Sequence, residues 1–169
     1  MKPLRNILVL LLIVAAGQNI ANAQTTKKDK QAAKEAAIKN SIDARHYTFI
    51  ANYVLPQRGS ARQLTEVYYD LRVTKDSVIA FLPYFGRAYF DVPYGATDGG
   101  IKFTSTKFDY KVTEKKKGGW EIIIKPTDAK NINSLTLYIS PDGYASLSVN
   151  SINRDFISFN GYLKEEKKK

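Results

Sequence analysis

Apolar and polar side chains alternate along most of the chain after residue 46, and this period of two constrains the fold more than any other feature. Successive side chains of a β-strand point to opposite faces of the sheet, so alternation predicts strands with one packed face and one wet face. The runs that show it are Tyr47–Leu55, Val67–Val73, Phe108–Val112, Trp120–Ile124, Leu135–Ile139, Ala145–Val149 and Phe156–Leu163. Ser77–Leu82 is apolar on both faces, which predicts a central strand.

Short turn sequences separate most of these runs. Ser140-Pro141-Asp142-Gly143 is the strongest, because proline sets the second turn position and glycine accepts a positive φ. Gly118-Gly119 and Lys75-Asp76 predict two further turns. Short connections imply antiparallel neighbours. We therefore predict a mainly β (α+β) domain of about eight antiparallel strands in a meander, barrel-like or folded into a two-layer sandwich.

A helix is expected before the strands, over residues 25 to about 40. Alanines and one pair of isoleucines give this stretch a weak apolar stripe. Alanine favours a helix but buries little area, so the first turns should fray. We expect Ile38, Ile42 and Ala44 to dock the helix on the strands.

The N-terminus has the layout of a cleaved secretory signal. Basic residues precede an apolar run, Ile7 to Ala16, which is about half the length of a membrane-spanning helix. Ala21 and Ala23 occupy the positions that a signal peptidase reads, which predicts cleavage before Gln24. The expected organisation is a signal peptide at 1–23, helix and lead-in at 24–45, β domain at 46–163 and lysine-rich tail at 164–169. The mature protein should then be periplasmic or secreted.

Composition removes several classes of function. The chain has no cysteine, which excludes disulfides, thiolate metal sites, a cysteine nucleophile and a lipid-modified cysteine anchor, so we expect a soluble product. The formal net charge is +10, and the excess lies in residues 27–39, in Lys115 to Lys117 and in the tail. Export argues against a nucleic-acid partner, and an anionic component of the envelope is the better candidate. No transmembrane segment is expected.

The stretch from Pro83 to Gly100 breaks the alternation, with prolines and glycines among five aromatic residues and Arg87. One interpretation is a corner of the sheet that caps the core, with Arg87 paired to Asp70 or Asp91. The other is an aromatic-walled mouth in which Arg87 binds an anionic or planar ligand. The candidate ligand-binding residues are Tyr84, Phe85, Arg87, Tyr89, Tyr94 and Arg154.

Five motifs resemble those of a family of secreted bacterial proteins catalogued as domain of unknown function 4251. They are Leu82-Pro83-Tyr84-Phe85-Gly86-Arg87-Ala88-Tyr89, Asp98-Gly99-Gly100-Ile101, Gly119-Trp120, Ser140-Pro141-Asp142-Gly143 and the stretch from Ser151-Ile152-Asn153-Arg154 to Gly161. The resemblance runs from about Ala36 to Leu163. It implies an exported protein of Gram-negative bacteria and no particular activity, and it draws attention to Arg87 and Arg154.

Residues for familiar catalytic chemistry are scarce. With His46 as the sole histidine and no cysteine, a zinc site or a serine protease triad has little to build on. Asp109 and Glu121 lie on the polar phase of their strands, where a carboxylate is normally solvated. We expect no cofactor, no metal and no enzymatic activity. The preferred interpretation is a binding module for a small amphipathic or anionic ligand, and the alternative is a structural or interaction protein of the cell envelope with a filled core.

Overall fold

The computed structural model describes residues 27–65, 69–89, 99–116 and 118–164. A helix occupies residues 27–43, and ten strands follow in this part of the chain. The strands are β1 Tyr47–Pro56, β2 Arg62–Gln63, β3 Asp70–Val73, β4 Val78–Leu82, β5 Ile101–Ser105, β6 Phe108–Glu114, β7 Trp120–Pro126, β8 Ile132–Ile139, β9 Tyr144–Ser151 and β10 Ile157–Leu163. Several positions named above lie outside the described residues. They are the predicted signal segment, Asp91, Tyr94 and residues 165–169.

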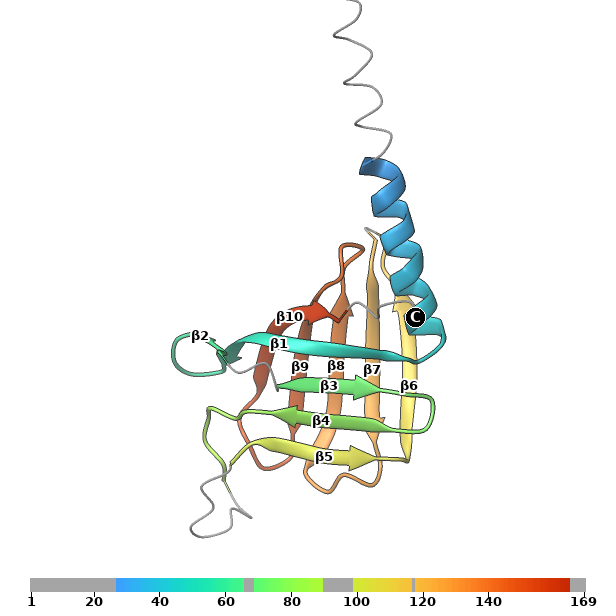
Figure 1. Ribbon diagram of the computed structural model, residues 1–169. Helices are drawn as coiled ribbons and strands as arrows, with labels where there is room; N and C mark the ends of the chain where they lie inside the picture. The colour runs from blue at the N-terminus through green and yellow to red at the C-terminus, as the bar shows by residue number, and fades with distance from the viewer. Residues whose placement is uncertain (1–26, 66–68, 90–98, 117, 165–169) are drawn as a thin grey trace, which may run out of the picture.

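All ladders are antiparallel, and they join the strands in the order β5-β4-β3-β1-β10-β9-β8-β7-β6, with β2 paired to β1. In Figure 1, β1, β3, β4 and β5 form a front layer that crosses a back layer of β6 to β9. The strand β10 links the layers by pairing with both β1 and β9. The layers are also connected on the side away from β10, where β5 of the front layer continues directly into β6 of the back layer. These two strands are the two ends of the strand order and are not paired with each other. The result is a nearly closed, barrel-like sheet.

The interior of this barrel is filled by apolar side chains from both layers. The largest buried ones include Phe49 of β1, Leu82 of β4, Ile124 of β7 and Phe159 of β10, each with no exposed surface. On β9 and β10 the buried residues alternate with outward polar residues, as the period of two predicts. Trp120 is also buried and belongs to this core. The alternative of a filled core therefore describes the centre of the barrel correctly.

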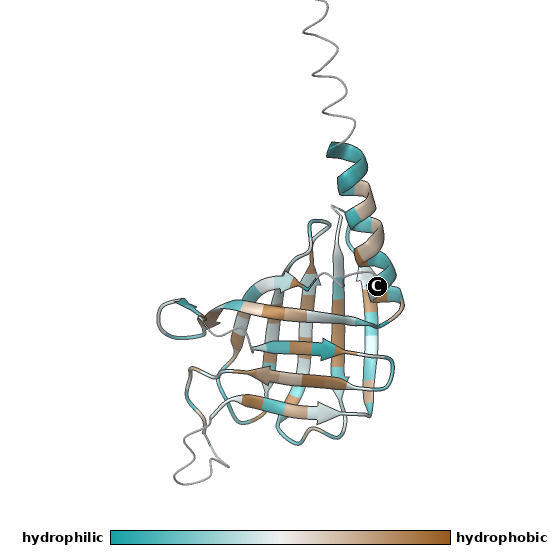
Figure 2. Cartoon of the chain, in the orientation of Figure 1, coloured by the Kyte–Doolittle hydropathy of each residue, from teal (hydrophilic) through white to brown (hydrophobic). Residues whose placement is uncertain are grey.

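The helix covers one of the two open corners of the barrel (Figure 1). Ile38 and Ile42 are buried in the core, as expected. The prediction for Ala44 is wrong: this residue lies in the turn after the helix and is exposed. Arg45 ends the turn in the left-handed region, with φ of 49°. In Figure 2 polar colours dominate the end of the helix that extends away from the sheet, as expected for a stretch that buries no residue before Ile38.

The carboxylate of Asp128 holds the turn between β5 and β6 by hydrogen bonds. Asp128, in the loop after β7, accepts hydrogen bonds from the Ser105 hydroxyl, from the backbone N–H of Thr106 at 2.9 Å and from that of Lys107 at 3.2 Å. These bonds favour the ionised carboxylate, with the Ser105 bond the largest effect, and they lower the pKa of Asp128 to about 2. The loop thereby holds the two strands that the sheet ladders leave unpaired with each other.

The predicted strands are confirmed, and two more are present. The first, β2, is a strand of two exposed residues, Arg62–Gln63. The second, β5, carries Ile101, Phe103 and Ser105 on its inner face, directly after the glycines that suggested only a turn. The Ser140–Gly143 turn is confirmed by a hydrogen bond of 2.9 Å from the Gly143 N–H to the Ser140 carbonyl and by φ of 82° at Gly143. Within the described residues no helix is both long and apolar enough to cross a membrane.

Candidate functional site

The described start of the segment that breaks the strand pattern, residues 83–89, lies against the link between β9 and β10, at the open corner opposite the helix (Figure 1). Ala88 and Arg154 form an isolated antiparallel bridge. The Tyr89 N–H donates to the Asn153 carbonyl at 2.8 Å, and the Asp155 N–H donates to the Arg87 carbonyl at 3.0 Å. Two segments far apart in the sequence thus satisfy each other's backbone groups and form one unit at this end of the barrel.

Two tyrosine hydroxyls tie the unit together. Tyr84 folds back over Gly86 and donates to the Arg87 carbonyl at 2.8 Å, with the Asp155 carbonyl 3.2 Å from the same hydroxyl. A Cβ atom at Gly86 would lie 2.5 Å from the Tyr84 oxygen, so glycine leaves room for this return. The Tyr89 hydroxyl donates to Oδ1 of Asp155. The conformation of the segment therefore depends on its own aromatic residues.

The electrostatics follow from these bonds. The hydrogen bond from Tyr89 lowers the pKa of Asp155, so this carboxylate is ionised at neutral pH. The same bond raises the pKa of Tyr89. Burial is the main cause of a raised pKa at Tyr84. The positive charges of Arg58 and Arg87 also lower the pKa of Asp155, with smaller effects than the Tyr89 bond.

Arg154 has a partly structural role. Its Nη1 donates to the carbonyls of Gly99 and Gly100, the second at 3.2 Å, and its guanidinium carbon lies 4.9 Å from the centre of the Tyr84 ring. The described hydrogen bonds of Arg154 go to carbonyls, and the neighbouring Asp155 carboxylate accepts from Tyr89.

Arg87 is exposed at the surface. Of its two predicted acid partners, Asp70 pairs with Arg72 instead, at 3.1 Å from Arg72 Nε, and Asp91 lies outside the described residues. The side chain of Tyr89 beside it is 60% exposed. The core below is filled, so a ligand of Arg87 would sit on the outer surface of this corner and not inside the barrel.

The fold brings together four of the six predicted ligand-binding residues, namely Tyr84, Arg87, Tyr89 and Arg154. Phe85 lies under a different arginine, with the guanidinium carbon of Arg62 4.9 Å from its ring centre. Tyr94 lies outside the described residues.

Sequence reasoning missed the apolar neighbours Ile152 and Phe156, which are 62% and 45% exposed. It also missed Arg58, which follows Gln57. The Gln57 side chain accepts a hydrogen bond of 3.1 Å from the Phe156 N–H. The signal available in the sequence was the presence of two large apolar residues, Ile152 within the Ser151–Arg154 motif and Phe156 just after it, among polar residues.

A cavity of about 170 Å³ opens beside Arg154, between the start of β5 and the loop before β8. Ile101, Phe103 and Ile132 contribute to its walls. The Ser151 hydroxyl, which also lines it, is buried and has no hydrogen-bond partner among the described residues. The cavity is small for a ligand of any size, and it adds a polar pocket to the same end of the barrel.

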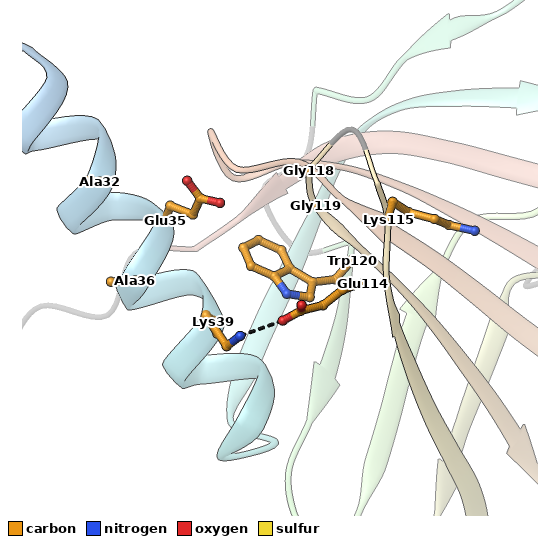
Figure 3. Close-up of a pocket in the computed structure, with 9 residues that line it drawn as sticks. All are labelled: Ala32, Glu35, Ala36, Lys39, Glu114, Lys115, Gly118, Gly119 and Trp120. Carbon is orange, nitrogen blue, oxygen red and sulfur yellow. Dashed lines mark hydrogen bonds and ion pairs between the residues drawn. The ribbon is translucent and has the colours of Figure 1, made fainter.

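A larger groove, of about 370 Å³, lies at the opposite end between the helix and the β6–β7 hairpin (Figure 3). The Trp120 indole and Ala36 face each other across it, and the ion pair of Lys39 with Glu114 closes one side at 2.5 Å. In Figure 3 the Lys115 side chain points away from the helix, and its Nζ lies 2.8 Å from Glu121. Lys39 and Glu114 pair with each other and Lys115 pairs with Glu121, so both lysines of this groove are already neutralised by an acid and offer less positive charge to a ligand than the Arg87 corner.

Side chains that could bind a metal do not gather in the described part of the chain. No cluster of three or more histidine, aspartate or glutamate side chains that could hold a metal occurs there. Asp109 is exposed, and Glu121 is held by Lys115. The site residues above are instead suited to binding, with guanidinium groups for an anion and aromatic faces for apolar groups.

Comparison with known proteins gives a family and a fold. The family model described as "Domain of unknown function (DUF4251)" matches residues 29–163. The crystal structure of a DUF4251 family protein from Bacteroides eggerthii DSM 20697 is similar, with a TM-score of 0.57 and 19% sequence identity over 79% of this chain and 90% of that chain. At this identity the likeness shows a shared fold alone. No curated protein matches the chain.

Proposed function

We propose that this chain, which belongs to the DUF4251 family of domains of unknown function, is an exported, non-enzymatic binding module for an amphipathic anion of the cell envelope. Its binding surface is the Arg87 end, which we define as Arg58, Arg87, Tyr89, Ile152 and Phe156. The observation that carries the proposal is the exposure of Tyr89, Ile152 and Phe156 on segments that also carry the exposed Arg58 and Arg87 and contact each other.

Charge at the Arg87 end favours an anionic partner. Arg58 and Arg87 both act on Asp155, so two positive charges face one negative charge. A guanidinium offers a planar fork of donors that matches a phosphate or a carboxylate. An anion bound there would take the positive charge that Asp155 leaves uncompensated.

The apolar side chains favour a partner with a hydrocarbon part. Large exposed apolar groups that gather beside charged ones mark interaction sites more often than isolated ones do. In the sequence, Ile152 precedes and Phe156 follows the charged residues Arg154 and Asp155. Both apolar side chains are well exposed. A lipid or fatty-acid-like anion could place its head on the arginines and its tail on these two side chains. Such an arrangement needs no cavity in the core.

The proposal is tested with the chain from Gln24 and vesicles of phosphatidylglycerol and phosphatidylcholine, with pure phosphatidylcholine as the neutral reference. Each cation near an anionic surface contributes about 1 kcal/mol. Arg87→Met should therefore weaken sedimentation with anionic vesicles about fivefold. Lys125→Met, which removes one exposed charge from β7, is the matched control and should change binding much less. Equal losses in both variants would mean that net charge alone drives retention, and the proposal would be wrong.

The filled core also supports the alternative function, a structural or interaction protein of the envelope. In that case the exposed lysines of the β6–β7 turn, Lys115 and Lys116, would contact the partner. Replacing both by glutamate should then abolish vesicle retention, whereas Arg87→Met would leave it unchanged. The same assay thus separates the two functions.

A further inference from the structure

The outer face of three adjacent strands, β8, β9 and β10, carries no charged residue. We define this neutral face as the outward positions of β8 (Ser134 to Tyr138), β9 (Tyr144 to Asn150) and β10 (Ser158 to Tyr162). Every one of these positions holds serine, threonine, asparagine or tyrosine, although 25% of the residues of the chain are charged. The next strand outward, β7, returns to the usual pattern with Glu121 and Lys125.

A groove of about 250 Å³ continues the neutral face onto β1. It forms where the β1–β10 register shifts between Ala51 and Tyr53, which opens a space that β2 borders. Its polar lining consists of the amides of Asn52 and Gln63, the hydroxyl of Thr65 and the two tyrosines Tyr53 and Tyr162. All of the residues that line the groove are uncharged.

This chemistry matches a neutral, polyhydroxylated partner. Amides and hydroxyls each donate and accept hydrogen bonds, so they can pair with neighbouring hydroxyl groups of a sugar. Aromatic faces pack against apolar surfaces such as the C–H face of a sugar ring, and a tyrosine keeps a polar tip in water. A charged polymer would lose hydration on this face without finding an opposite charge. The neutral face therefore disfavours charged partners and remains open to neutral ones.

The tyrosines are placed to serve such a partner. Tyr162 pairs with Tyr144 across β10 and β9, and Tyr53 borders the groove from the other side. Tyr53, Tyr138, Tyr144 and Tyr162 are all exposed. The register places Tyr138 and Tyr53 at the two ends of one row, with Ser146 and Asn160 between them, and places Tyr144 and Tyr162 side by side in the adjacent row.

We propose that the neutral face binds a neutral polysaccharide, with one sugar ring in the groove between Tyr53 and Tyr162 and the rest of the chain along β10, β9 and β8. This site is separate from the Arg87 end and does not depend on it. A second copy of the chain on the same face is the competing occupant, and the test distinguishes it.

The experiment uses the chain from Gln24 and immobilised neutral polysaccharides, namely dextran, laminarin, mannan and xylan, with dextran sulfate as the charged counterpart of dextran. We expect binding to at least one neutral polymer, insensitive to salt, and at least tenfold weaker binding for Tyr53→Ala with Tyr162→Ala. Gln63→Ala, an exposed position, gives a second variant should the double variant fail to fold. Val112→Ala, an exposed apolar position on β6, is the control and should bind normally.

Three results would overturn the inference. The first is no binding to any neutral polymer in the set, and the second is binding to dextran sulfate alone. The third is a dimer in analytical ultracentrifugation that the double tyrosine variant abolishes, which would assign the face to a second copy. Arg87→Met should leave polysaccharide binding unchanged, so that failure here and failure of the anion-binding proposal are distinguishable.

Discussion

At Gly161 the backbone of β1 passes so close to β10 that no side chain fits. A Cβ atom there would lie 1.8 Å from the Ile50 carbonyl oxygen and 3.0 Å from the ring of Phe49. Backbone atoms cannot move aside as the end of a flexible side chain can. This close approach lies in the β1–β10 ladder that joins the front layer to the back layer. The glycine is thus required by the crossing of two strands and not by an unusual φ angle.

Gly161→Ala should lower the free energy of unfolding by about 3 kcal/mol, at the upper end of the usual cost of overpacking, because one backbone segment has to shift. Urea denaturation followed by circular dichroism measures the loss. Gly99→Ala is the matched control, since its Cβ atom would meet nothing within 4 Å, and its stability should stay near that of the parent. Similar losses in the two variants would refute the close-approach argument.

Among the elements, the N-terminal helix stabilises the barrel by covering one open corner. Only its last turns contribute, because Ile38 and Ile42 are its buried residues and everything before them is exposed. The free end adds little packing, which fits the weak apolar stripe of the alanine-rich sequence.

Ile42→Ala should therefore cost about 2–5 kcal/mol of unfolding free energy, as expected for deleting a fully buried isoleucine side chain. Thermal and urea unfolding check this value. Ile152→Ala makes the same chemical change at an exposed position and should cost well under 1 kcal/mol. If Ile42→Ala were as stable as Ile152→Ala, the helix would not be part of the core.

The β5–β6 corner predicts a pH dependence. The pKa of Asp128 is about 2 in the folded chain and about 4 in an unfolded one, so its bonds stabilise the fold fully above pH 4. That contribution is lost as the pH falls from about 4 to about 2. Asp128→Asn should lower the urea midpoint at pH 7, and the gap to the parent should narrow below pH 4. A gap that stays constant down to pH 2 would show that the carboxylate charge has no role at this corner.

For the molecule as a whole, local sequence patterns predicted the elements well and their partners poorly. Alternation, apolar runs and turn residues identified β1, β3, β4 and β6 to β10, because all of these signals depend on neighbours in the chain. The strand β5 was missed because glycines precede it and its inner face ends in Ser105, a polar residue whose hydroxyl is satisfied by the distant Asp128. The two-residue β2 has too few residues to show a period.

The residues of the candidate site also fall into two groups, those that the sequence could bring together and those that only the fold brings together. Tyr84, Arg87 and Tyr89 could be grouped from sequence because one segment holds them. Arg58, Ile152 and Phe156 could not, since they reach the site through the β1–β10 ladder and the Gln57–Phe156 contact. The neutral face was equally hidden: serine at alternate positions indicates only a wet face, and the absence of charge becomes visible once three strands lie side by side.

The most direct test of the binding proposal maps the contact on the molecule. The ¹⁵N-labelled chain from Gln24 is titrated with dihexanoylphosphatidylglycerol and, separately, with dihexanoylphosphatidylcholine, and amide shifts are followed by NMR. We predict that the anionic lipid alone shifts amides of residues 57–58, 87–89 and 152–156, which surround the Arg87 end. Shifts centred on Lys115 and Lys116 or on the helix, or equal shifts with both lipids, would contradict the account.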